Sequence, residues 1–164
     1  MLTVEELKGL LAYNPDTGLF KWRYKARFGI NPGDIAGRNG FWGYIRICVK
    51  GKDYRANRLA WAFMHGSIPE GMDVDHINGQ RDDNRLSNLR LASRSQNRMN
   101  SKVRPGTNTG MKGIRWRDDI KKFRVTIYLN GKGHNGGSFD NIEDAKLAAQ
   151  KLRESLHGEF CRHN

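Results

Sequence analysis

The fold of this chain is decided near its middle, in residues 71–100, which read GMDVDHINGQRDDNRLSNLRLASRSQNRMN. An acidic residue and a histidine, Asp75 and His76, are adjacent at the end of a short apolar run. Asn88 follows His76 by twelve residues, and Asn97 follows Asn88 by nine. A hairpin and a helix with these spacings can bring both amides back toward the Asp–His pair. The stretch therefore offers the groups needed for one metal ion, one general base and one residue that orients the base.

The pattern of this stretch predicts a β-hairpin followed by a helix. Residues 72–77 are predicted to form a strand that enters the site, and the leucines in 86–91 mark a short returning strand that holds Asn88. Ser93 and Gln96 have the spacing of a capping box, which predicts that a helix starts directly after Ser93.

The residue types suit cleavage of a phosphodiester bond. Mg²⁺ takes few protein ligands and keeps several waters, so the Asp75 carboxylate and the Asn97 amide oxygen are a suitable pair of ligands. Neutral His76 would take a proton from the attacking water, and Asn88 would hold the backbone beside it. Successive side chains of a strand point to opposite faces. Asp75 and His76 can therefore serve one site only if the strand ends at this pair.

The bulk composition favours small modules and an anionic partner. The chain has 164 residues, 37% of them hydrophobic, and a formal net charge of +12. Such an excess of positive charge indicates an anionic binding partner, with nucleic acid favoured and a membrane surface as the second choice. The chain begins with acidic residues and has no apolar run of membrane-spanning length, so we expect a cytoplasmic protein that does not bind membranes. The two cysteines, Cys48 and Cys161, exclude a four-cysteine zinc site.

The residues before the central stretch predict a small segment of helices and strands. Thr3 and Glu6 form a capping box for a helix that stops by Tyr13. The remaining expected elements are a strand at 19–24, a loop at 28–40, a hairpin at 44–55 and a helix at 58–65 capped by Asn57. The tryptophans of this segment are assigned to the core rather than to a base-stacking platform: Trp22, Trp42 and Trp61.

The residues after the central stretch predict a second small domain. Residues 102–110 have the composition of a linker. After it, strands are predicted at 111–117, at 122–130 and in a third segment that ends at Phe139. An alanine-rich helix capped by Asn141 follows. The fold class is therefore α+β. We place the first domain at 1–104, with its hairpin–helix core at about 72–102, and the second, three antiparallel strands plus one helix, at 105–164.

Residues 57–100 resemble the HNH endonucleases, in particular the phage and intron-encoded homing group with the order Asp-His…Asn…Asn. The resemblance implies a ββα-metal fold. It also implies that His76 is the general base, that Asp75 and Asn97 bind the metal, and that Asn88 is the supporting asparagine. Many relatives have His at the last position, and Asn97 in its place favours Mg²⁺ or Mn²⁺ over Zn²⁺.

Residues 108–160 resemble the Apetala/ethylene-response-factor DNA-binding domain, in the form found attached to phage endonucleases. The matching points are GIRW at 113–116, the strand at 123–129, GSF at 137–139 and the alanine-rich helix, with Phe123 where plant domains often have Trp. The resemblance implies that the sheet enters the major groove. The side chains then expected to face DNA are Arg115, Arg117, Arg124 and Tyr128, while Trp116 is either buried or placed on a base or sugar.

A cationic helical face is expected beside the candidate site. Arg94, Arg98 and Lys102 lie four residues apart, so they contact phosphates or form a solvated face.

These observations predict a metal-dependent HNH endonuclease of a phage or mobile element. It would bind double-stranded DNA as a monomer and use one Mg²⁺ or Mn²⁺ ion, and a single metal site favours nicking. The alternatives are a catalytically silent DNA-binding regulator and an RNA-binding accessory protein.

Overall fold

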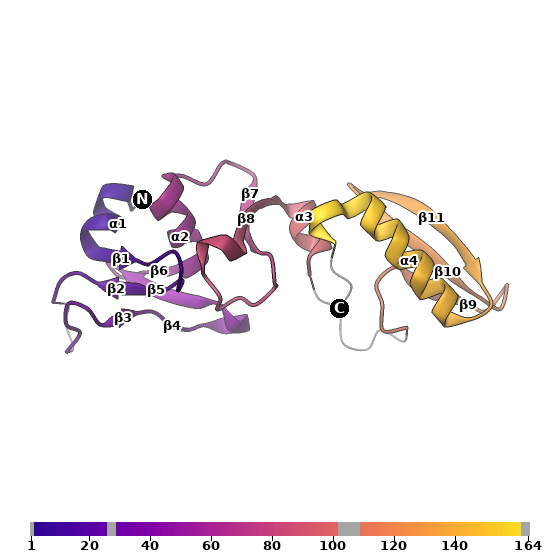
Figure 1. Cartoon of the computed structure of the whole chain (residues 1–164), viewed down its shortest axis with the longest axis horizontal. Helices are drawn as coiled ribbons and strands as arrows, with labels where there is room; N and C mark the ends of the chain where they lie inside the picture. Colours follow the sequence, from indigo (N-terminus) through magenta and orange to yellow (C-terminus); the bar gives the residue numbers. More distant parts are fainter. Residues whose placement is uncertain (1, 26–28, 102–108, 162–164) are drawn as a thin grey trace. The chain divides into compact units, whose positions relative to one another are not determined.

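The computed structural model describes residues 2–25, 29–101 and 109–161. By its contacts the chain divides into two compact units, Met1–Ser93 and Arg94–Asn164. Each unit has its own apolar core. Within these ranges, the first unit contains several small antiparallel sheets and the second contains one (Figure 1). The expectation of a mixed α and β fold built from small antiparallel sheets is confirmed. The domain boundary predicted at 104/105 falls on residues outside the described ranges.

The first unit contains three small sheets and two helices within its described residues. The sheets have the strand orders β1-β2-β3, β4-β5-β6 and β7-β8. The elements are α1 (Val4–Leu10), β1 (Leu11–Tyr13), β2 (Phe20–Trp22), β3 (Ile35–Ala36), β4 (Arg38–Asn39), β5 (Ile45–Val49), β6 (Lys52–Arg55), α2 (Ala56–His65), β7 (Met72–His76) and β8 (Leu89–Ser93). Their core is formed by residues including Leu7, Leu11, Phe20, Ile47, Val49, Leu59 and Val74.

The start of the chain differs from the prediction after the first helix. Both bonds of the Thr3–Glu6 capping box are present. The helix ends at Leu10, however, and the next three residues form β1. Leu11 is fully buried and pairs with Trp22 across the sheet, so tertiary packing rather than helix propensity decides its conformation. The predicted loop at 28–40 also contains the short strands β3 and β4.

The predicted capping role of Asn57 is wrong. The helix α2 begins one residue earlier, at Ala56, and its N-cap is Arg55, which makes no side-chain capping bond. Asn57 is buried inside the helix, and its Nδ2 donates to the carbonyl oxygen of Val74 at 2.7 Å. The amide therefore ties α2 to β7, the strand that carries the Asp–His pair.

The second unit has one three-stranded sheet, in the order β11-β10-β9, with α4 lying along one face of it (Figure 1). The contact residues include Val125 and Ile127 of the sheet and Ala145 and Ala149 of the helix, all of them buried. The elements are α3 (Arg94–Met99), β9 (Ile114–Arg117), β10 (Lys122–Leu129), β11 (Lys132–Phe139) and α4 (Ile142–His157). The expected arrangement of three strands and one helix is observed.

The helices in the described part of the chain lack the length and apolarity needed to cross a bilayer.

Replacement of the α4 cap tests the helix of the second unit. The Asn141 side chain accepts a hydrogen bond from the backbone N–H of Asp144 at 2.8 Å. We expect Asn141→Ala to lower the free energy of unfolding by about 1 kcal/mol, because this donor loses its partner. Asn141→Ser keeps an acceptor and should stay close to wild type in urea titrations followed by circular dichroism. Equal stability of the two variants would contradict the capping role.

Candidate functional site

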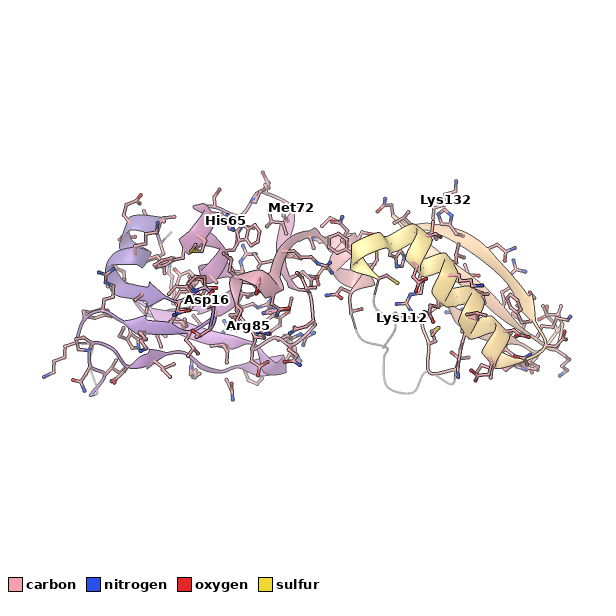
Figure 2. The ribbon with its side chains drawn as sticks, viewed as in Figure 1. Asp16, His65, Met72, Arg85, Lys112 and Lys132 are labelled. Carbon is pink, nitrogen blue, oxygen red and sulfur yellow. The ribbon has the colours of Figure 1, made fainter. Side chains whose placement is uncertain are left out.

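The Asp–His pair lies at the end of β7, so the predicted end of the strand at this pair is confirmed. The strand starts at Met72 (Figure 2) and ends at His76. Asp75 is only 7% exposed and His76 only 3% exposed. Asp75 lies opposite Arg90 of β8, and its Oδ2 is 3.1 Å from Nη2 and 3.2 Å from Nε of that arginine. A buried carboxylate is thus paired with a guanidinium on the facing strand.

A buried amide fixes the orientation and tautomer of His76. The Nε2 atom of His76 is 3.2 Å from Oδ1 of Asn84. The other end of this amide, Nδ2, donates to the carbonyl oxygen of Asp82 at 3.0 Å, which turns Oδ1 toward the imidazole. Because an amide oxygen can only accept, Nε2 of His76 must donate the hydrogen. In the neutral ring the lone pair is then on Nδ1.

The surroundings of His76 keep its ring neutral. Burial lowers the pKa of His76 below its ordinary value, against the opposing effects of the Asn84 hydrogen bond and the charges of Asp75 and Asp83. Desolvation disfavours the imidazolium, which carries a charge. A neutral imidazole at physiological pH is the form that can accept a proton.

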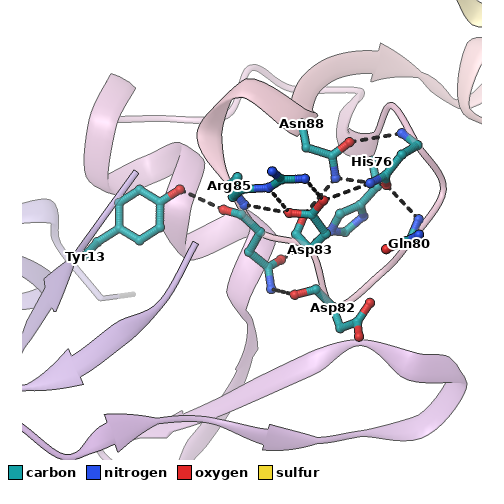
Figure 3. A network of polar contacts seen from close by, with 9 residues as sticks. Tyr13, His76, Gln80, Asp82, Asp83, Arg85 and Asn88 are labelled. Atoms are coloured by element: carbon teal, nitrogen blue, oxygen red, sulfur yellow. Dashed lines mark hydrogen bonds and ion pairs between the residues drawn. The ribbon is translucent and has the colours of Figure 1, made fainter. Parts of the chain in front are cut away.

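Asn88 organises the loop that follows His76 (Figure 3). It lies in the 3₁₀ turn η2 (Leu86–Asn88), immediately before β8, so the prediction that the returning strand itself holds it is wrong. Its Oδ1 accepts from the backbone N–H of Asn78 at 3.0 Å, and its carbonyl oxygen accepts from the N–H of Ile77 at 2.9 Å. Asn88 therefore holds the two backbone positions that follow His76.

The carboxylate of Asp83 completes this network (Figure 3). It accepts from the Asn78 amide at 2.8 Å and from Arg85 at 2.6 Å and 2.8 Å. Hydrogen bonding from Arg85 lowers the pKa of Asp83 to about 2, so this carboxylate stays ionised near neutral pH.

The N-terminal segment holds the same loop from the other side. The hydroxyl of Tyr13 donates to the carbonyl oxygen of Asn84 at 2.7 Å, and burial raises the pKa of that hydroxyl to about 12. Gly18 has φ +72°, and a Cβ atom there would lie 2.4 Å from the backbone nitrogen of Arg85. Only glycine permits this approach. Residues more than sixty positions away in sequence thus position the partner of His76.

A row of arginines crosses the sheet β4-β5-β6. Arg38 pairs with Arg46 in the register, and Arg46 pairs with Arg55. Asp53 forms ion pairs with Arg38 at 3.0 Å and with Arg46 at 3.7 Å. Like charges directly opposite one another destabilise a sheet, so the row is suited to an anionic partner. The row was not predicted, although the hairpin expected at 44–55 places the last two arginines opposite each other.

The other predicted residues of this region lie in the second unit. Asn97 is on α3, which starts at Arg94 as expected, so Asp75 and Asn97 belong to different units. Arg94 and Arg98 are exposed on the same helix, whereas Lys102 lies outside the described residues.

Of the residues of the second unit that were predicted to contact DNA, Trp116 lies on the opposite face of the sheet from the others. Arg115 of β9 lies opposite Arg124 of β10, and Tyr128 is exposed further along β10. Trp116 pairs with Phe123 instead, and their ring centroids are 4.7 Å apart, on the face that carries the core side chains. Arg117 forms an ion pair with Asp119 at 2.6 Å.

A pocket of about 390 Å³ also lies in the second unit. It brings Arg98 of α3 and Tyr128 of β10 together with Lys112, Arg153 and His157. Lys112, labelled in Figure 2, donates to the hydroxyl of Ser101 at 3.0 Å. The pocket is therefore lined by several cationic side chains.

By their chemistry alone, the two predicted ligands suit a hard divalent cation. Within the described ranges, no group of three or more His, Cys, Asp and Glu side chains is arranged to hold a metal ion. The predicted set has one carboxylate and one amide, and oxygen donors of this kind suit Mg²⁺ or Mn²⁺. Since Arg90 engages Oδ2 of Asp75, a cation bound to this carboxylate either shares it with the guanidinium or displaces the guanidinium.

Removal of Arg90 tests how much the buried ion pair with Asp75 contributes to stability. We expect Arg90→Met to lower the free energy of unfolding by about 3–5 kcal/mol, because the buried Asp75 carboxylate loses the guanidinium that pairs with it. Arg38→Met is the control: it breaks the exposed pair with Asp53 and should cost about 1 kcal/mol or less. Urea titrations in EDTA measure both variants, and equal losses would contradict this account.

Comparison with known proteins gives several matches. A family model described as HNH endonuclease matches residues 54–99, a range that contains Asp75, His76, Asn88 and Asn97. Protein 3.8 of Escherichia phage T7 is 37% identical over 112 residues, which are 66% of this chain and 92% of that protein. An uncharacterized HNH endonuclease of Acanthamoeba polyphaga mimivirus is 32% identical over 101 residues, which are 62% of this chain and 51% of that protein.

A solved structure that concerns DNA binding and cleavage by the HNH homing endonuclease I-HmuI also matches. It has 24% sequence identity and a TM-score of 0.46, and the match covers 60% of this chain and 55% of that one. The family assignment rests on the match at 54–99 and on the phage relative, 92% of which is covered by this chain. The chain belongs to the HNH endonuclease family.

Proposed function

We propose that this protein is a metal-dependent endonuclease that hydrolyses phosphodiester bonds of duplex DNA, encoded by a phage or mobile element and active in the cytoplasm of a bacterial host. The observation that carries the proposal is the buried pair Asp75 and His76, with Asn84 holding the imidazole in one neutral tautomer. Hydrolysis of a phosphodiester can be catalysed by such a base beside an anionic ligand for a cation.

His76 would act as the general base. Its Nδ1 takes a proton from the attacking water while the water oxygen forms a bond to phosphorus. The bond from phosphorus to the leaving sugar oxygen breaks, and that oxygen takes a proton from solvent. Asn88 keeps the backbone beyond His76 in place through its bonds to Ile77 and Asn78, so the imidazole keeps its direction during the reaction.

The proposed cation ligands are the Asp75 carboxylate and the Asn97 amide oxygen. A bound Mg²⁺ or Mn²⁺ ion would stabilise the negative charge that develops on the phosphate. Arg90 holds the Asp75 carboxylate from the opposite strand and balances its negative charge. One site per chain favours a monomer that nicks one strand.

The second unit is proposed as the DNA-binding part, similar to the Apetala/ethylene-response-factor domain. Its support is the three-stranded sheet, one face of which is covered by α4 while Arg115 and Arg124 lie opposite each other on neighbouring strands. Arg94 and Arg98 would add phosphate contacts from α3.

Loss of the general base tests the catalytic assignment. We expect His76→Ala to slow the relaxation of supercoiled plasmid by about a hundredfold or more with Mg²⁺ or Mn²⁺, because the water is no longer deprotonated. His65→Ala removes an exposed histidine that stacks on Trp61, and it should nick at the wild-type rate. Equal rates for wild type and His76→Ala would refute the assigned role of His76. A wild-type protein that binds DNA but nicks nothing with any divalent cation would be a catalytically silent regulator.

The role of the second unit is tested by salt dependence. We expect the double variant Arg115→Ala/Arg124→Ala to bind duplex DNA more weakly and to reduce the slope of log affinity against log salt by about 2, one for each lost phosphate contact. Lys151→Ala, on the exposed side of α4, serves as the matched control and should keep the wild-type slope. Fluorescence anisotropy over a range of KCl gives both slopes. An unchanged slope for the double variant would remove the sheet from the DNA interface.

A further inference from the structure

The loop between β4 and β5 presents two aromatic side chains to solvent. Phe41 is 83% exposed and Trp42 is 77% exposed, the highest values among the large apolar side chains of the described residues. The prediction that Trp42 belongs to the core is therefore wrong. Single exposed apolar residues are common on soluble proteins, whereas two adjacent aromatic rings at one loop tip require an explanation.

The backbone holds this aromatic tip (Phe41–Trp42) in a fixed shape. Trp42 has φ 59° and ψ 25°, a left-handed conformation that bulky residues rarely adopt. The loop is closed by the Gly40 N–H, which donates to the carbonyl oxygen of Tyr44 at 2.8 Å. Arg81 donates from Nη1 to the Trp42 carbonyl oxygen at 2.9 Å. Strained conformations are retained where the surroundings enforce them, and they concentrate at functional sites.

The surroundings of the tip are cationic. Arg55 and Arg81 lie over the Tyr44 ring, with their guanidinium carbons 4.4 Å and 5.0 Å from its centroid. The arginine row of β4-β5-β6 continues from there, and Arg46 packs against Gly40 at the base of the loop. A second copy of this chain would bring like charges together at such a surface. The charge fits a polyanion.

The tip is also connected to the candidate site within the first unit. The Tyr44 ring centroid is 5.9 Å from that of His76. Arg81, which holds the tip, stacks on the same tyrosine. The aromatic tip and His76 thus share Tyr44 and Arg81 as neighbours. An anionic lipid surface would fit the charge, but it would give the aromatic tip no relation to His76.

We propose that Phe41 and Trp42 form a wedge that enters duplex DNA at the base step beside the scissile phosphate and unstacks it. The proposal rests on the proposed function, because it takes duplex DNA as the substrate. Apolar side chains inserted between base pairs kink the duplex and bring more of the DNA into contact with the protein. The arginine row then lies along the phosphates of the bent segment.

A wedge of this kind must overcome the unstacking cost of the step it enters. The cost is smaller where the duplex contains a mismatch. Wild-type protein should therefore bind a duplex with one central A·A mismatch about tenfold more tightly than the fully paired duplex of the same sequence.

The experiment measures both affinities by fluorescence anisotropy with short dye-labelled duplexes in EDTA. The test variant is Phe41→Ser/Trp42→Asn, since asparagine tolerates the left-handed backbone of position 42. It should lose the mismatch preference. Trp42→Phe keeps an aromatic ring and should retain the preference. Ile35→Ser removes another exposed apolar side chain, on β3, and should behave as wild type. Thermal unfolding checks that each variant is folded.

Equal affinity of wild type for the two duplexes would overturn the wedge, and so would a preference that survives in Phe41→Ser/Trp42→Asn. Binding of wild-type protein to anionic vesicles without a mismatch preference would assign the aromatic tip to a lipid surface. This result would also overturn the wedge. The plasmid assay keeps the two proposals apart. Nicking without mismatch preference refutes only the wedge, and mismatch preference without nicking refutes only the nuclease function.

Discussion

The site depends on one constraint: a carboxylate and an imidazole are buried side by side in a hairpin of only two strands. Removal of a charged or polar group from water is costly unless the group finds partners. Arg90 supplies the partner of Asp75, and Asn84 supplies the partner of His76. A two-stranded hairpin is marginal by itself. It is supported here by the Asn57 amide on the Val74 carbonyl oxygen.

Asparagine side chains make many of the hydrogen bonds in the loop around His76. Asn78, Asn84 and Asn88 each bond to backbone groups or to one another, and the last two are buried. An amide can donate and accept at once without adding a charge. A neutral network of this kind fixes the imidazole and leaves its protonation to be decided mainly by burial. Carboxylates in the same positions would favour the imidazolium, which is unable to act as a base.

The parts of the fold that could be predicted from the sequence are those set by local pattern. The alternation in residues 122–129, the Asn130–Gly131 turn and the cap at Asn141 indicate the second unit correctly. Contacts between distant segments leave no such local signal. Tyr13 and Asn84 are 71 residues apart in the sequence. The residues around each of them give no indication that the two residues are in contact. The error at Trp42 has a related cause, because composition alone does not show that a backbone turn directs a large ring outward.

Two long-range contacts limit which fragments of this protein can fold by themselves. They are the Tyr13–Asn84 hydrogen bond and the close approach of Gly18 to Arg85. The segment that matches the family, residues 54–99, contains the proposed site residues but does not correspond to a folding unit. An excised peptide of that range would lack the N-terminal turn and most of the apolar cluster beneath the hairpin. Transplanting the site into another scaffold therefore means carrying over the first eighteen residues along with the motif.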